Sequence, residues 1–289
     1  MIISDGKTRY ATLVLGMILG TTGPAQAVDG VLEINQACAV NTGCFAGDTA
    51  GFPVEVTATG SYRLTSNLVV PDENTTAVVV SANNVTVDLN GFRVSGPTTC
   101  TTFPTVVCSQ AGAGNGIEAL FTSGITVRNG HITGMGNFGV RLQGLHNRVE
   151  GITVDQIGFR GINVGSHSIV KDCTVTATGS IGISAGAAAV VVGNSVANSG
   201  NHGIFGVSGV VKDNGVTSSD ADGINTAAQG SPAPLLIQSN SLTNNSGYGL
   251  NLRAESGYAD NVISGNSTGT VLGGVEMGTN VCDGNTTCP

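Results

Sequence analysis

Residues 149–162 read VEGITVDQIGFRGI, residues 170–183 read VKDCTVTATGSIGI, and residues 191–204 read VVGNSVANSGNHGI. Each segment opens on an aliphatic residue, from which offsets are counted. A second aliphatic residue stands at offset five, glycine at offset twelve and isoleucine at offset thirteen. Three further segments share the pattern, with isoleucine, valine or leucine at offset thirteen: residues 127–140, 211–224 and 237–250. One short structural unit is therefore repeated along the chain.

The length of the repeat predicts a parallel β-helix. Successive units start 20 to 22 residues apart between Val127 and Val211, which suits one coil of two or three short strands joined by Gly and Asn turns. A single coil cannot bury its aliphatic face, but coils stacked about 4.8 Å apart join these faces into one core. A leucine-rich repeat is excluded because its LxxLxL spacing is missing, and a propeller needs units of about forty residues.

The composition agrees with an all-β chain and excludes several other classes. The 289 residues include 44 glycines and no tryptophan, with 40% hydrophobic and 10% charged residues. This hydrophobic content argues against a disordered chain, and the lack of a three-residue glycine period excludes collagen. The net charge of -8 argues against nucleic-acid binding, because an acidic surface repels phosphates.

The N-terminal residues predict an export signal rather than a part of the fold. Lys7 and Arg9 precede an apolar stretch at residues 11–20, and residues 25–27 (AQA) match the small-x-small pattern that signal peptidase cleaves. The alternative is a buried N-terminal helix. No later stretch reaches eighteen apolar residues, so we expect no transmembrane segment. Cleavage near Ala27 would release a secreted protein, extracellular or periplasmic.

The cysteines support the same compartment. Six of the seven cysteines form three close pairs outside the regular repeat, and an oxidising compartment favours a disulfide in each: Cys38 with Cys44, Cys100 with Cys108, and Cys282 with Cys288. Zinc is the competing interpretation, but no CxxC or HxxxH spacing supports it. Cys173 is left over at a position that the repeat turns inward, and we expect a buried, unreactive thiol there.

A column of asparagines at offset three suggests stacked turns. Its members are Asn90, Asn194, Asn214, Asn240 and Asn261. Asparagine tolerates a left-handed backbone, and stacked asparagine side chains can hydrogen-bond along the axis of the coil. We therefore expect these residues at turns between strands.

The repeat, the asparagine column and the opening segments together resemble a known superfamily. The opening consists of residues 60–68 (GSYRLTSNL), followed by residues 85–92 (VTVDLNGF). Over roughly residues 55–280 the chain resembles the secreted right-handed parallel β-helix (pectate-lyase-like) superfamily. This superfamily includes polysaccharide lyases, glycoside hydrolases, epimerases, phage tailspikes and adhesins, so the resemblance implies a fold and not one activity.

We predict one all-β domain, a right-handed parallel β-helix solenoid of about eight to ten coils with disulfide-bonded caps. No linker rich in proline or charge divides the chain. The predicted parts are a signal peptide at residues 1–27, an N-terminal cap at 28–60, the parallel β-helix repeats at 61–272, and a C-terminal cap at 273–289.

The outward positions of one strand row supply candidate binding residues. Because offsets thirteen and fifteen point inward, offsets eleven, fourteen and sixteen are expected to face solvent along one flank. This flank gathers aromatic, arginine and amide side chains, which bind sugars by ring contacts and hydrogen bonds. The candidate binding residues are Phe138, Arg141, Asn163, Phe205, Asn225, Tyr248, Asn251 and Arg253. An ordinary solvated β-face is the alternative interpretation.

Three residues of the same flank are candidates for catalysis. His202 and Asp222 occupy offset eleven on adjacent coils, roughly 5 Å apart, where a carboxylate can orient an imidazole as a general base or acid. Arg160 can neutralise a uronate carboxylate during β-elimination. Residues 201–204 (NHGI) faintly resemble polygalacturonase-like hydrolases, but the paired aspartates of those enzymes are missing. A chance surface pair is the alternative.

Two further features carry no chemistry in this interpretation. No cofactor is predicted, and Ca²⁺ is the one metal considered, although neither an acidic cluster nor a GGxGxD repeat supports it. At offset one, charges of opposite sign alternate between neighbouring coils, which suits cross-strand pairing: Asp88, Arg128, Glu150, Lys171 and Lys212. We interpret this column as structural.

The sequence thus predicts a secreted protein that binds an extended polysaccharide or cell-surface glycan along one exposed sheet face. One alternative is a polysaccharide lyase or glycoside hydrolase acting on the same face, and another is a structural or adhesive surface protein. We expect no nucleic-acid partner, and self-association into a homo-oligomer is left open.

Overall fold

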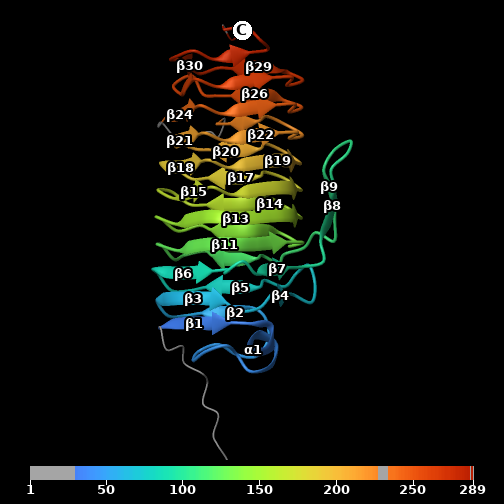
Figure 1. The fold of residues 1–289 in the computed structure, drawn as a ribbon, viewed down its shortest axis with the longest axis vertical. Helices are drawn as coiled ribbons and strands as arrows, with labels where there is room; N and C mark the ends of the chain where they lie inside the picture. The colour runs from blue at the N-terminus through green and yellow to red at the C-terminus, as the bar shows by residue number, and fades with distance from the viewer. Residues whose placement is uncertain (1–29, 227–233, 287, 289) are drawn as a thin grey trace, which may run out of the picture.

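The computed structural model describes residues 30–226, 234–286 and 288, which form one stack of ten coils with three rows of parallel strands (Figure 1). This arrangement confirms the predicted parallel β-helix. The predicted signal peptide lies outside the described residues. Among the described residues, no helix is long and apolar enough to cross a membrane.

Rows 1 and 2 form a single 19-stranded sheet because two long strands, β11 (Thr126–Thr133) and β13 (Arg148–Ile157), run through both rows. The other strands of row 1 are β1 (Val31–Ile34), β3 (Gly60–Leu64), β6 (Val85–Asp88), β15 (Ile169–Lys171), β18 (Ala189–Val192), β21 (Gly209–Lys212), β24 (Leu235–Gln238), β27 (Gly257–Ala259) and β30 (Val275–Glu276). Those of row 2 are β4 (Leu68–Val69), β7 (Arg93–Ser95), β16 (Thr174–Thr178), β19 (Ser195–Ser199), β22 (Gly215–Thr217), β25 (Ser241–Thr243), β28 (Val262–Ser264) and β31 (Val281–Cys282).

Row 3 is a separate ten-stranded parallel sheet, and its outer face carries the candidate site. Its strands are β2 (Val54–Val56), β5 (Val78–Val80), β10 (Ile117–Ala119), β12 (Phe138–Leu142), β14 (Arg160–Val164), β17 (Ile183–Ala185), β20 (Ile204–Gly206), β23 (Ile224–Asn225), β26 (Tyr248–Asn251) and β29 (Gly269–Leu272). A separate antiparallel hairpin joins β8 (Thr99–Thr101) to β9 (Val107–Ser109).

The register of row 3 repeats the sequence pattern coil by coil. Val140 pairs with Ile162, and Ile162 pairs with Ile183, so each offset has its own column of side chains. The aliphatic residues at offset thirteen are fully buried: Val140, Ile162, Ile183, Ile204, Ile224 and Leu250. These columns make one continuous core, and its burial is the main source of stability in a stacked repeat.

The asparagine column lies at the turns between rows 1 and 2, as predicted, and its side chains lie inside the coil. Asn194, Asn214 and Asn240 are buried, and each Nδ2 donates to the Oδ1 of the next asparagine at 2.9–3.0 Å. The expected hydrogen bonding along the axis is therefore present. The left-handed residues are the ones just before these asparagines, such as Asp213 (φ 57°). Asn90 differs from the other members of the column, because it is exposed and its own backbone is left-handed, with φ 52°.

All three predicted disulfides are present, and Cys173 is free and buried as expected. The segment at residues 28–60 contributes β1 and β2 to the sheets as well as the short helix α1 (Gln36–Asn41), which lies below the first coil in Figure 1. Residues 273–289 add β30 and β31 at the opposite end. Both end segments thus continue the stack as well as closing it.

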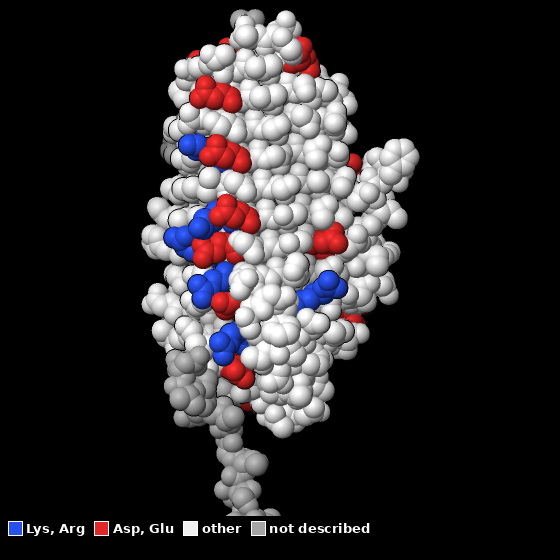
Figure 2. All heavy atoms as spheres, viewed as in Figure 1, with Lys and Arg blue, Asp and Glu red and all other residues white. Residues whose placement is uncertain are grey.

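The offset-one residues form a ladder of ion pairs along row 1, seen as a stripe of alternating blue and red in Figure 2. Arg128 Nε lies 3.0 Å from Asp88 Oδ2, and Lys171 Nζ lies 3.5 Å from Glu150 Oε2. Solvent-exposed pairs of this kind contribute about 0–1 kcal/mol each. Four of the five charged residues of this column thus pair with one another, and Lys212 pairs with its chain neighbour Asp213 instead.

Candidate functional site

The outer face of row 3 presents one side chain per coil at offset fourteen. In hydrogen-bonded register these are Val79, Glu118, Arg141, Asn163, Ser184, Phe205, Asn225 and Asn251. Most are half-buried, and Ser184 and Asn225 are buried. The predicted candidates at this offset therefore share one continuous column.

The offset-eleven column is only partly exposed, which corrects the expectation that it faces solvent. Asn115, Phe138, Ile181 and Asp222 are all buried. The cause is local packing at the corner where row 2 turns into row 3. Phe138, for example, packs edge-on against Phe159 with ring centroids 5.4 Å apart, and the Arg141 guanidinium covers it at 4.9 Å.

The β8–β9 hairpin lies along this corner, beside the candidate site, and rises next to the stack in Figure 1. Cys100 and Cys108 close the hairpin, and their sulfurs lie 3.7 and 3.4 Å from the Ile157 carbonyl oxygen. Near its tip, the Val106 N–H donates to Asp220 Oδ2 at 2.7 Å. The sequence places Cys100 and Cys108 outside the regular repeat, but no local pattern shows where the segment between them folds back.

His202 and Asp222 are in direct contact. His202 Nδ1 lies 3.3 Å from Asp222 Oδ2 and 3.3 Å from the Asp222 backbone nitrogen. A neutral imidazole can accept from this N–H, whereas a protonated one can donate to the carboxylate. The His202 side chain is 21% exposed and that of Asp222 only 9%, so the imidazole stands between the carboxylate and the surface.

Asp222 is held by the residues around it. Its Oδ2 accepts from the side-chain amides of Asn225 and Asn251 at 2.7 and 3.0 Å, and its Oδ1 accepts from the Tyr248 N–H at 2.8 Å. Burial opposes ionisation, but these donors and His202 outweigh it and lower the pKa of Asp222 to about 2. The carboxylate is therefore charged at neutral pH and suited to orienting His202.

Arg160 reaches toward the coil that precedes His202. Its Nη1 donates to Ser184 Oγ at 3.4 Å, and its guanidinium lies 5.1 Å from the centre of the Phe159 ring. Burial lowers the pKa of the guanidinium, yet an arginine stays charged at neutral pH. Arg160 Nε is buried and has no hydrogen-bond partner within the part of the chain that the structure describes.

These contacts join Arg160 and His202 into one cluster across three coils. Ser184, which accepts from Arg160, pairs in register with Phe205. The Phe205 ring in turn stacks on His202 at 6.4 Å between centroids, with 26° between the planes. We call Arg160, Ser184, Phe205, His202 and Asp222 the row 3 cluster.

The other predicted binding residues have different surroundings. Arg141 Nη1 lies 3.3 Å from Glu118 Oε2, so its charge is already paired. The Arg253 backbone N–H donates to Thr226 Oγ1 at 2.9 Å. Tyr248 lies over Gly269, where an added Cβ would approach its ring to 3.1 Å. Asn163 is half-buried in the offset-fourteen column between Arg141 and Ser184.

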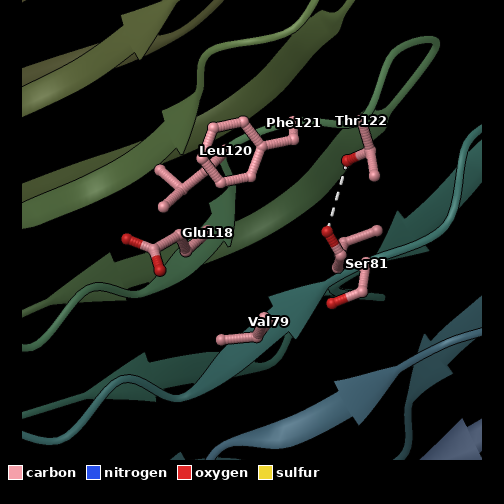
Figure 3. Close-up of a pocket in the computed structure, with 7 residues that line it drawn as sticks. Val79, Ser81, Glu118, Leu120, Phe121 and Thr122 are labelled. Carbon is pink, nitrogen blue, oxygen red and sulfur yellow. Dashed lines mark hydrogen bonds between the residues drawn. The ribbon is translucent and has the colours of Figure 1, made fainter.

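A cavity that the sequence does not predict continues the outer face of row 3 toward the N-terminal end. It has a volume of about 270 Å³, and it lies between β5 and the segment that follows β10 (Figure 3). Phe121, at its wall, is 93% exposed. No chemical motif marks this site, because its lining is mainly aliphatic.

No group of three or more His, Cys, Asp or Glu side chains converges on a common point in residues 30–226, 234–286 and 288. The ionisable groups of the row 3 cluster are instead one imidazole, one carboxylate and one guanidinium. Such a set can bind an anion, and it can move a proton at His202.

Comparisons with known proteins agree with the fold. A family model described as a right handed beta helix region matches residues 67–209. Among solved structures, the A-module of mannuronan C-5 epimerase AlgE4 from Azotobacter vinelandii is similar, with a TM-score of 0.54 and 13% identity over 84% of this chain and 70% of that chain. No curated protein matches by sequence.

Two further solved structures are similar with TM-scores below 0.5. One is the enzymatically active domain of tailspike protein 2 of bacteriophage CBA120, with a TM-score of 0.42 and 13% identity over 86% of this chain and 43% of that chain. The other is the periplasmic alginate epimerase AlgG, with a TM-score of 0.41 and 13% identity over 86% and 82%. The three-row coil and the match to the right handed beta helix model over residues 67–209 show that the chain folds as a right-handed parallel β-helix, the fold that its resemblance to the pectate-lyase-like superfamily implies.

Proposed function

We propose that the outer face of row 3 binds an extended, carboxylate-bearing polysaccharide or cell-surface glycan. The observation that carries the proposal is the row 3 cluster, in which a cation, Arg160, stands two coils before an aromatic ring and an imidazole, Phe205 and His202, that lie side by side on one coil. A linear glycan lying along the axis of the coil would meet the cation on one coil and the two rings two coils further on. The fold shared with a mannuronan epimerase module agrees with this class of ligand.

Arg160 gives the proposal its preference for an anionic chain. The protein carries 19 acidic and 11 basic residues, so a basic side chain that is not matched with a carboxylate is unusual on its surface. Arg160 contacts the Ser184 hydroxyl and the Phe159 ring. A uronate carboxylate can accept from the fork of guanidinium donors in a way that a neutral sugar cannot.

We also propose that the protein works outside the cytoplasm. Its three disulfides need an oxidising compartment to persist. The predicted signal peptide at residues 1–27 would provide the route. When the protein is denatured without a reducing agent, a free-thiol assay should find one thiol, that of Cys173.

Arg160→Ala and Tyr248→Ala should each weaken glycan retention about tenfold, since a buried arginine or aromatic contact contributes about 1–3 kcal/mol to a typical site. Affinity electrophoresis in gels containing uronate-rich and neutral polysaccharides measures the effect. Lys212→Ala is the matched control, because Lys212 lies on row 1 and is 44% exposed beside Asp213. An equal loss of glycan retention in Lys212→Ala would show that row 3 is not the binding face.

A second candidate function is polysaccharide lyase activity, which the His202–Asp222 contact favours. β-Elimination needs a base at C5 of a uronate and a cation on its carboxylate. His202, oriented by an ionised Asp222, suits the first role, and Arg160 suits the second. Glycoside hydrolysis is less well supported, since it needs two carboxyl groups across the bond, and the Asp222 carboxylate already accepts from three donors.

His202→Ala distinguishes the two candidates. For a lyase, removing the base should lower turnover by about two to four orders of magnitude, measured as ultraviolet absorbance of unsaturated products. For a binding protein, the wild type forms no such products, and the variant loses some affinity at most. His131→Ala, an exposed histidine on β11 of row 2, is the control and should leave either readout unchanged.

A further inference from the structure

The cavity beside Phe121 lies on the same column as the row 3 cluster, toward the N-terminal end. In register, Val79 pairs with Glu118, and Glu118 pairs with Arg141, so two of its lining residues continue the offset-fourteen column. A glycan that follows row 3 past Arg141 would therefore reach this cavity next. Figure 3 shows Val79 below and Leu120 and Phe121 above the space between them.

The lining of the cavity is apolar, and its one charged group is already engaged. Val79, Leu120 and Phe121 provide the apolar walls. Glu118 Oε2 accepts from Asn115 Nδ2 at 2.6 Å and pairs with Arg141 at 3.3 Å, so the carboxylate is committed to neighbours outside the cavity. Ser81 is exposed and brings a hydroxyl to the rim.

We propose that this cavity binds an acetyl group carried by a sugar of the glycan that occupies row 3. The inference rests on the proposed function and adds the substitution of the ligand to it. An acetyl methyl gains free energy by leaving water for aliphatic and aromatic walls, whereas a sugar hydroxyl would lose its hydrogen bonds there. The acetyl carbonyl can accept from the Ser81 hydroxyl at the rim.

The exposure of Phe121 supports the same occupant. This ring is 93% exposed although it stands at the wall of an apolar cavity. The backbone beneath it is fixed, because buried Thr122 donates from Oγ1 to the Val80 carbonyl at 3.2 Å. A ligand group in the cavity would cover the inner face of the ring without any rearrangement of the coil.

The test compares matched polymers. Polygalacturonate, alginate and xylan are each acetylated chemically and compared with the parent polymer by affinity electrophoresis of the native protein. We expect the acetylated form of each polymer that is retained to be held about fourfold more tightly, the effect of burying one methyl group. Phe121→Ala should abolish the preference for the acetylated polymer and leave retention of the parent polymer unchanged. Ser81→Ala should reduce this preference, which we express as the ratio of the two affinities.

Phe103→Ala is the matched control, since Phe103 is 89% exposed but lies in the β8–β9 hairpin, outside the cavity. It should leave the ratio at its wild-type value. If the wild type retains a parent polymer but shows no preference for its acetylated form, the inference is wrong and the proposed function stands. If all six polymers pass without retention, the proposed function and the inference fall together.

Discussion

Gly182→Ala is expected to destabilise the β-helix by about 3 kcal/mol or more, because it overpacks a coil that has no room for a methyl group. A Cβ at this position would lie 2.5 Å from Val196 Cγ1, 2.7 Å from the Gly203 carbonyl oxygen and 2.8 Å from Ser199 Oγ. One of these neighbours is backbone of the next coil, so relief requires the stack itself to move. The offset-twelve glycines thus mark positions where neighbouring coils leave no room for a side chain.

The measurement is urea unfolding followed by circular dichroism, with the variant compared at its transition midpoint. Gly215→Ala is the matched control: Gly215 lies on β22 of row 2, its Cβ would meet nothing within 4 Å, and its φ is outside the left-handed region. Alanine there should leave the midpoint unchanged or raise it slightly, since it restricts the unfolded chain. Equal losses in both variants would show that glycine acts through backbone freedom and not through packing.

The same glycines explain why the fold is predictable from the sequence. From Gly116 to Gly249, coil after coil has an aliphatic residue at offset thirteen and no side chain at offset twelve, whatever the other positions hold. Because the same requirements recur in these coils, the sequence indicates the repeat length and the parallel stacking many times over. Gly182 with Ile183 and Gly203 with Ile204 are two such copies.

The surroundings of the candidate site are less predictable, because they depend on groups distant in sequence. The proximity of His202 and Asp222 follows from their shared column. The burial of Asp222 does not, since its donors come from Asn225, Tyr248 and Asn251 on two different coils. The position of the β8–β9 hairpin likewise depends on where its disulfide-closed end meets Ile157.

The inward asparagines are a different case, in which the residue type itself is misleading. Asparagine usually faces water or occupies turns, so the position of Asn214 in the turn between β21 and β22 is predictable, whereas its burial is not. Inside this coil each amide finds partners above and below it, and burial then costs little. A second ladder of this kind joins Asn245 to Asn266. On earlier coils the same column holds the buried residues Ser199 and Ser219, so no sequence motif marks it.

Asn214→Ala should therefore destabilise the protein by about 3 kcal/mol although it removes no apolar contact, because it leaves buried polar groups unpaired. Asn214 Oδ1 accepts from both the backbone N–H and the Nδ2 of Asn194, and Asn214 Nδ2 donates to the Val191 carbonyl oxygen at 3.0 Å. None of these partners can turn to water, since the column lies inside the coil.

Asn163→Ala is the matched control, an asparagine of the outer row 3 face that water can reach. The urea concentration at the midpoint of unfolding should be the same for Asn163→Ala and the wild type within experimental error, since surface substitutions usually change stability by less than about 0.5 kcal/mol. A loss at Asn214 with none at Asn163 would establish that buried amide pairing helps to hold successive coils in register. Equal midpoints for both variants would instead assign the stability of the stack to its aliphatic and glycine columns alone.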